Sequence, residues 1–152
     1  SLASAMTRTG VDTYLGQAVH GVSVHPLLLV AGIALVLVFL SELASNTALA
    51  TAVLPVLAAP AVAVGVHPLM LMIPAALACS LAFMMPVGTP PNAIVFATGH
   101  VSMRQMVRAG FWLNLLGTLV ITLVVYGAGS WLLGVDLTTP PAPAEAPMSS
   151  EP

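Results

Sequence analysis

Apolar residues follow one another along this chain in long blocks. Short polar clusters interrupt the blocks, and Pro55 and Pro60 are expected to weaken the second one. The blocks cover residues 24–40, 48–60, 61–87 and 109–135. Several of them approach or exceed the roughly 20 residues that a helix needs to cross a bilayer. The first two are apolar on all sides, which is typical of helices enclosed by other helices or by lipid. The pattern therefore predicts an all-α integral membrane protein.

The two ends of the chain differ from these blocks. Residues 1–22 mix Arg8, Asp12 and His20 with apolar side chains, and this pattern favours an amphipathic helix in the membrane interface. Residues 137–152 are rich in Pro, Ala and polar residues, which favours a disordered tail. We expect the membrane helices to lie between these two segments.

Composition strengthens the membrane assignment and excludes several functions. The chain is 59% hydrophobic and only 5% charged, against about 25% charged residues in a soluble domain. Three basic residues and a net charge of −2 cannot form a surface for nucleic acid. The single cysteine, Cys79, lies in an apolar stretch and is expected to be a small buried hydrophobic residue. His20 and His25 have no partners at metal-ligand spacing.

Two polar clusters interrupt the apolar part of the chain. They are residues 45–48, Ser-Asn-Thr-Ala, and residues 88–93, Gly-Thr-Pro-Pro-Asn-Ala. No Asp, Glu, Lys or Arg lies between Glu42 and Arg104, so both clusters belong at membrane depth. A broken helix is tolerated there only where it packs in protein or lines a cavity. Two such breaks predict the binding site of a transporter.

The first cluster permits two arrangements of the helices beside it. If residues 45–47 are the tip of a re-entrant hairpin, residues 24–44 and 48–60 enter and leave by the same face. If the cluster is a kink, both segments cross the membrane, and Ser45 and Thr47 merely cap the second part. Periodicity does not decide between them, because both arms are apolar all round.

Helix ends at these clusters bring opposite partial charges together. A helix C-terminus presents unpaired carbonyl groups to a cation, and a helix N-terminus presents unpaired N–H groups to an anion. We expect residues 87–89 to end one half-helix with exposed carbonyls. Gly88 permits close approach of an ion to the backbone, and Pro90 suits the first turn of the next helix.

No basic side chain lies near either cluster, so hydroxyl groups, amide groups and backbone N–H groups must hold any anion there. Binding of a multivalent anion then depends on a cation bound at the same time. This dependence is a physical route to sodium-coupled symport.

The residues around both clusters match a known family. Residues 42–48 (ELASNTA) and 84–96 (MMPVGTPPNAIVF) resemble the divalent anion:sodium symporter family, carriers of dicarboxylates, citrate and sulfate. Residues 65–69 (GVHPL) and 108–111 (RAGF) also look like it. The resemblance covers essentially all of residues 1–137, and the two longer motifs together are specific.

The resemblance implies the second of two inverted repeats of an elevator-type transporter, which works as a homodimer. In that arrangement residues 23–60 form a re-entrant helical hairpin with its tip at 45–47. Residues 61–103 form a discontinuous transmembrane helix with its break at 86–92, and residues 109–136 form the last transmembrane helix. The first repeat is expected to be missing from the chain, which would then carry half of a binding site.

The resemblance also assigns the site. It implies that a substrate anion meets Asn46 and Thr47 beside Ser45 at the hairpin tip, and Thr89 and Pro90 at the helix break. A sodium ion is expected at Ser41, Ala44, Asn46 and Gly88. The implied partners are a small divalent anion, sodium and the lipid bilayer, with no enzyme activity.

Several alternatives stay open at this point. Glu42, the single acid inside the apolar region, is either a proton-coupling group or a structural acid hydrogen-bonded by backbone. Asn114 and Thr118 are expected to make hydrogen bonds between helices rather than to touch substrate. A proton-coupled carrier and a non-transporting membrane subunit are the rival functions.

Orientation follows from the few charges. Arg104 and Arg108 share one short loop, which favours the cytoplasmic side. The base of the hairpin and the C-terminal tail then face outward. We expect a multi-pass protein of the cell membrane, the plasma or bacterial inner membrane.

Overall fold

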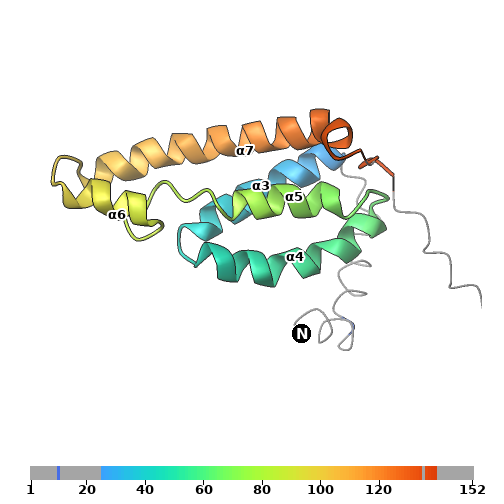
Figure 1. Ribbon diagram of the computed structural model, residues 1–152, viewed down its shortest axis with the longest axis horizontal. Helices are drawn as coiled ribbons and strands as arrows, with labels where there is room; N and C mark the ends of the chain where they lie inside the picture. The colour runs from blue at the N-terminus through green and yellow to red at the C-terminus, as the bar shows by residue number, and fades with distance from the viewer. Residues whose placement is uncertain (1–9, 11–24, 135, 140–152) are drawn as a thin grey trace, which may run out of the picture.

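The computed structural model describes Gly10, residues 25–134 and residues 136–139. Within this part the chain forms helices and no strand (Figure 1). The helices are α3 (Pro26–Ser41), α4 (Asn46–Ala63), α5 (Leu69–Ala78), α6 (Pro90–Ala97) and α7 (Met103–Leu133). The predicted interfacial helix at residues 1–22 and most of the predicted tail lie outside the described residues.

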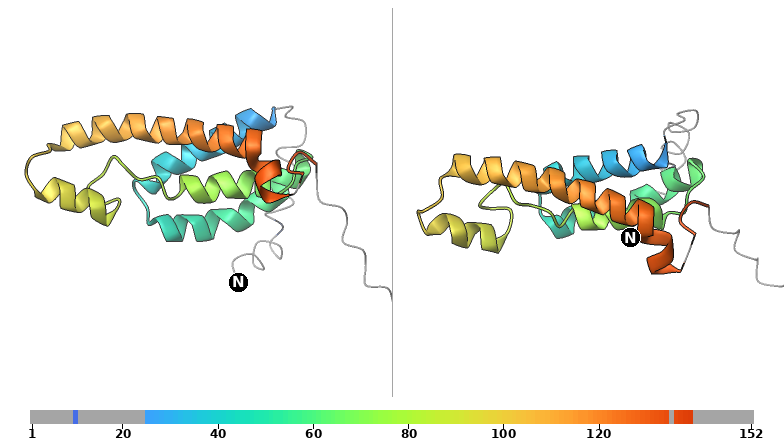
Figure 2. Two further views of the ribbon diagram at one scale, coloured as in Figure 1. Left: turned by 45° about the horizontal axis from the view of Figure 1, so that its top comes forward. Right: turned by 90° about the horizontal axis from the view of Figure 1, so that it is seen from above.

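Helices α3 and α4 run in opposite directions and are joined by the short turn at residues 42–45 (Figure 1). Helix α5 packs against α3, α4 and α7, and α7 also packs against α3. Helix α7 runs along the whole bundle, and α6 lies beyond the turn at 42–45, close to the start of α7 (Figure 2). The non-helical segment 79–89 connects α5 to α6 and passes the turn between α3 and α4 (Figure 1).

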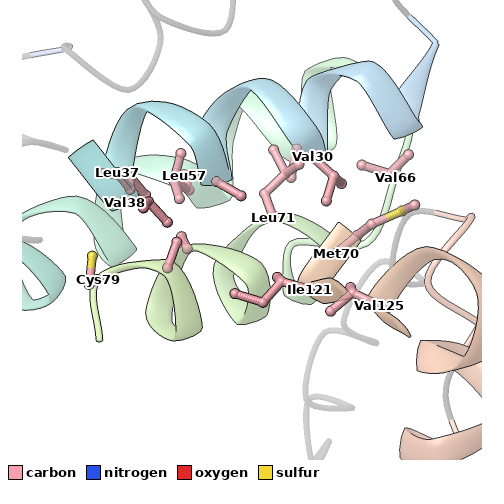
Figure 3. Close-up of a cluster of buried hydrophobic side chains, with 14 of the residues drawn as sticks. Val30, Leu37, Val38, Leu57, Val66, Met70, Leu71, Cys79, Ile121 and Val125 are labelled. Atoms are coloured by element: carbon pink, nitrogen blue, oxygen red, sulfur yellow. The ribbon is translucent and has the colours of Figure 1, made fainter. Parts of the chain in front are cut away.

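The core lies where α5 meets its three neighbours. Val38, Leu71 and Val125 are at most 4% exposed and come from α3, α5 and α7 (Figure 3). Cys79, at the end of α5, is a free thiol that is 1% exposed, so its prediction as a small buried hydrophobic residue is confirmed. The bundle therefore has one continuous apolar core centred on α5.

The outer surface is apolar as well. Helix α7 exposes Trp112, Leu116 and Trp131 among other large apolar side chains. Such a surface is costly in water and is expected against lipid or further helices. Helices α4 and α7 have the length and hydropathy to span a membrane, and α3 and α5 are shorter apolar helices. The predicted all-helical membrane class agrees with this architecture.

The helix bounds differ from prediction between residues 48 and 103. Helix α4 continues through Pro55 and Pro60 to Ala63, where prolines were expected to weaken it. A turn that includes Gly65, with φ of +78°, then leads into α5. Because α5 ends at Ala78, the break spans residues 79–89 and starts earlier than the predicted 86–92.

Helix α7 begins before its predicted start at residue 109. Ser102 and Gln105 form a capping box, in which each side chain bonds the other residue's backbone N–H. Gly134, with φ of +63°, follows the last helical residue, as is common for a helix C-terminus. Local capping chemistry therefore sets both ends of this helix.

Candidate functional site

The turn between α3 and α4 contains the first polar cluster. Helix α3 ends at Ser41 with Glu42 as its C-cap, and α4 begins at Asn46 with Ser45 as its N-cap. Asn46 and Thr47 therefore belong to the first turn of α4 and not to the loop. The Ser45 side chain makes no capping hydrogen bond. The reading of Ser45 as a simple helix cap is therefore not supported.

The first turn of α4 carries hydrogen-bonding groups that have no partner within the helix. The backbone N–H groups of residues 46, 47 and 48 have no partner within the helix, and they carry its positive partial charge. Ser45 and Thr47 are exposed there, and Asn46 is half-buried. The Asn46 Oδ1 atom is buried and has no hydrogen-bond partner among the described residues. The turn thus presents both donors and one unpaired acceptor.

Glu42 joins this turn to the helix break. Its Oε1 atom accepts hydrogen bonds from the backbone N–H of Phe83 at 2.7 Å and of Met84 at 2.9 Å. Its Oε2 atom accepts from the N–H of Met85 at 3.0 Å. Asn114 of α7 donates its Nδ2 to Oε1 at 2.7 Å. The structural alternative for Glu42, an acid hydrogen-bonded by backbone, agrees with this geometry.

Two further side chains hold the break in place. The Ser41 hydroxyl lies 2.8 Å from the Val38 carbonyl oxygen and 2.9 Å from that of Leu81, so it links α3 to the break. Asn92 of α6 donates its Nδ2 to the carbonyl oxygens of Ala82 and Met85, at 2.7 and 3.1 Å. Backbone groups freed by the missing helix turns are satisfied by these side chains, as a dry environment requires.

The second cluster is arranged differently from the prediction. Residues 87–89 do not end a half-helix, because α5 already ends at Ala78, so the expected helix-end carbonyls are not at Gly88. Thr89 is the N-cap of α6, and Pro90 and Pro91 occupy its first turn as predicted. Since proline has no N–H, α6 offers only the N–H of Asn92 in that turn. The first turn of α4 therefore has more free backbone N–H groups than the first turn of α6.

The structure brings some of the expected site residues together. A Cβ atom on Gly88 would lie 3.5 Å from Glu42 Oε2 and 3.2 Å from the Met85 carbonyl oxygen. Gly88 thus lies beside the turn that carries Ser41 and Glu42. Among the described residues, no hydrogen bond joins residues 45–47 to Thr89 or Pro90. Ala44 is exposed in the same turn.

The chain matches a known family along nearly its whole length. Residues 1–135 match the family described as the sodium:sulfate symporter transmembrane region. The chain belongs to this family. The resemblance carried by residues 42–48 and 84–96 is thereby confirmed.

Two proteins similar in sequence to this chain come from Staphylococcus species. The sodium-dependent dicarboxylate transporter SdcS of Staphylococcus saprophyticus is 50% identical over 143 residues, which are 92% of this chain and 27% of the relative. SdcS of Staphylococcus aureus strain USA300 is 48% identical over 141 residues, with the same two coverages. The chain thus spans about a quarter of the length of these relatives. Both are named as transporters and not as enzymes.

Two contacts that the sequence does not predict lie near the helix break. The bond between Asn114 and Glu42 confirms that Asn114 bonds between helices, but its partner was not foreseen. Thr118 instead donates to the Asn114 carbonyl oxygen of its own helix at 2.8 Å, so the prediction that Thr118 bonds between helices is wrong.

Gly110 of α7 lies against the backbone of Phe83 and Met84 in the helix break. In the sequence, only the position of Gly110 within the RAGF motif at residues 108–111 indicates that this glycine has a special role.

Proposed function

We propose that this chain is the C-terminal part of a sodium-coupled symporter for dicarboxylates or related divalent anions. The observation that carries the proposal is the junction made by Glu42. It holds the turn before α4 against the helix break, inside a stretch that has no other charged side chain. Membership of the symporter family and the names of the staphylococcal relatives support the substrate class.

The cation side of the proposed site lies at the end of α3. A helix C-terminus carries negative partial charge, and Ser41 and Glu42 occupy that end. The Ser41 hydroxyl donates its one proton, so its oxygen lone pairs stay available to sodium. We propose sodium ligands from Ser41, Ala44, Asn46 and Gly88.

The anion side lies at the start of α4. The backbone N–H groups there and the side chains of Ser45, Asn46 and Thr47 bind one end of the anion, with Thr89 and Pro90 beside it. No Lys or Arg is present between residues 43 and 103 to neutralise a dianion. Sodium therefore has to supply the positive charge, and this requirement couples the two solutes.

The proposed topology is a re-entrant hairpin formed by α3 and α4. Helix α3 has 16 residues, or about 24 Å, which is less than the roughly 30 Å hydrocarbon thickness. Both outer ends of the hairpin lie at the same end of the bundle (Figure 1). The rest of the proposal follows the family resemblance: an elevator motion, a homodimer and a place in the plasma or inner membrane.

Proton coupling through Glu42 fits this geometry less well. All four groups that contact the carboxylate are N–H donors. A protonated carboxyl group would turn its own hydrogen toward one of them. These contacts match a structural acid that is hydrogen-bonded mainly by backbone better than they match a proton-coupling group.

Sodium dependence tests the proposed function. The full-length protein that contains this chain is reconstituted into liposomes, and uptake of labelled succinate is measured under sodium, potassium and proton gradients. We expect uptake only with sodium, because nothing else near the site neutralises the dianion. Uptake that ignores sodium and follows the proton gradient would identify a proton-coupled carrier. No uptake under any gradient by folded protein would favour a non-transporting subunit.

Gly88→Ala should weaken sodium binding. The added Cβ would meet the Met85 carbonyl oxygen at 3.2 Å and the Ala82 Cβ at 3.3 Å, both tight contacts. Overpacking of this kind costs about 1–3 kcal/mol, so the sodium concentration for half-maximal uptake should rise roughly tenfold. Gly32→Ala on α3 is the matched control, since its Cβ would meet no atom within 4 Å. Equal sodium dependence in both variants would contradict the prediction.

A further inference from the structure

Glu42 is a buried acidic residue, and its structural role does not explain why this position carries a charge. It is 5% exposed, and it is the only Asp, Glu, Lys or Arg between residues 26 and 103. A buried charge is normally paired with an opposite charge or avoided. Among the described residues its four hydrogen-bond partners are neutral N–H groups, and none of them carries a positive charge. A net charge thus remains at the junction between turn and break.

The two carboxylate oxygens are used unequally. Oε1 accepts three hydrogen bonds, from Phe83, Met84 and Asn114, and is saturated. Oε2 accepts one, from Met85, and lies on the side of Gly88. Each carboxylate oxygen has about two acceptor positions, so one position on Oε2 remains free among the described residues. The less satisfied oxygen therefore lies beside Gly88, one of the four residues to which we assign sodium.

We propose that Glu42 sets the sodium affinity of this site, as its positioning residue and as its fixed negative charge. The inference rests on the proposed sodium-coupled function. The three backbone bonds fix segment 83–85, and with it Gly88, against the end of α3. The uncancelled charge attracts a cation and opposes a dianion until sodium is bound.

Glu42→Gln removes the charge and keeps the size of the side chain. Its amide group would turn one N–H group toward the donors that now surround the carboxylate. We expect the sodium concentration for half-maximal uptake to rise roughly tenfold or more in the reconstituted full-length carrier. The maximal rate and the half-saturating succinate concentration, both at saturating sodium, should change much less. A purely structural role would instead lower the maximal rate and leave sodium dependence as it was.

Two further variants keep the test decisive. Asn114→Ala removes one of the four bonds but leaves the charge and the backbone bonds, so sodium half-saturation should rise by only about two- to threefold. Asp136→Asn is the control, because it makes the same chemical change at an exposed carboxylate outside the helices. Should Glu42→Gln not fold, Glu42→Asp tests the positioning role, since the shorter acid keeps the charge but not all four contacts. The sodium concentration for half-maximal uptake should then rise, and an unchanged value would overturn the inference.

The outcomes separate this inference from the proposed function. Wild-type uptake without sodium dependence would overturn the proposed function, and the inference with it. Sodium-dependent wild-type uptake with unchanged sodium half-saturation in the Glu42 and Asn114 variants would overturn the inference alone. A selective loss of sodium affinity in the Glu42 variant, graded by Asn114→Ala and absent in Asp136→Asn, supports it.

Discussion

Gly110→Ala is expected to detach the helix break from α7. An added Cβ would lie 2.5 Å from the Phe83 carbonyl carbon and 2.6 Å from the Met84 Cα, and backbone atoms cannot rotate away as a side chain can. The cost of such overpacking is about 3 kcal/mol. Phe83 and Met84 also donate two of the bonds that hold Glu42, so the junction between turn and break should loosen as well.

The measurement is thermal unfolding of the purified full-length protein in detergent, followed by size-exclusion chromatography after heating. Gly127→Ala is the matched control on the same helix, because its Cβ would meet no atom within 4 Å. Replacing a helical glycine at an open position should leave stability unchanged or raise it by up to about 1 kcal/mol. If both variants unfold at the wild-type temperature, α7 does not contact the break as described.

Hydropathy alone predicted the helices that are long and uninterrupted. The apolar block at 24–40 corresponds to α3, and the block at 109–135 to most of α7. Such blocks are readable because they are long and no proline interrupts them after the first helical turn. The Pro90-Pro91 pair was also readable, because proline is favoured in a first helical turn. These features depend on local sequence only.

The start of the break could not be predicted in this way. Residues 81–87, Leu-Ala-Phe-Met-Met-Pro-Val, contain no polar side chain, so they resemble the helix before them. They leave the helix because Glu42 and Ser41, some 40 positions earlier, bond their backbone groups. Glu42 and Asn114 are 72 positions apart. Contacts of such separation have no signature in the periodicity of either segment.

The candidate site could be predicted from the sequence only in part. Ser41 and Gly88 were proposed as sodium ligands from the family resemblance, and the fold brings both to Glu42. The roles of Ser45, Thr47, Thr89 and Pro90 toward the anion stay predictions. A helix begins at Asn46, as expected, but no helix ends at Gly88, because the break is longer than the sequence predicts. The binding roles of these helix ends stay predictions.

Asn46→Ala is expected to abolish sodium-dependent uptake without lowering stability. The Asn46 Oδ1 atom is buried and unpaired among the described residues, and such an acceptor costs about 1–3 kcal/mol. A ligand that pairs with it would remove this cost on binding. Alanine removes the unpaired acceptor together with the proposed ligand atom. The unfolding temperature should therefore stay equal or rise, while uptake falls roughly 100-fold.

Uptake of labelled succinate and thermal unfolding are measured on the same preparations of full-length protein. Thr98→Ala is the control, because its exposed hydroxyl bonds only the Val95 carbonyl oxygen and the nearby His100 N–H. It should keep both wild-type uptake and wild-type unfolding. A lower unfolding temperature for Asn46→Ala, with uptake reduced in proportion to folded protein, would show that Asn46 stabilises the hairpin. Unchanged uptake would remove the first turn of α4 from the site, since the unpaired oxygen would then meet no transported ion.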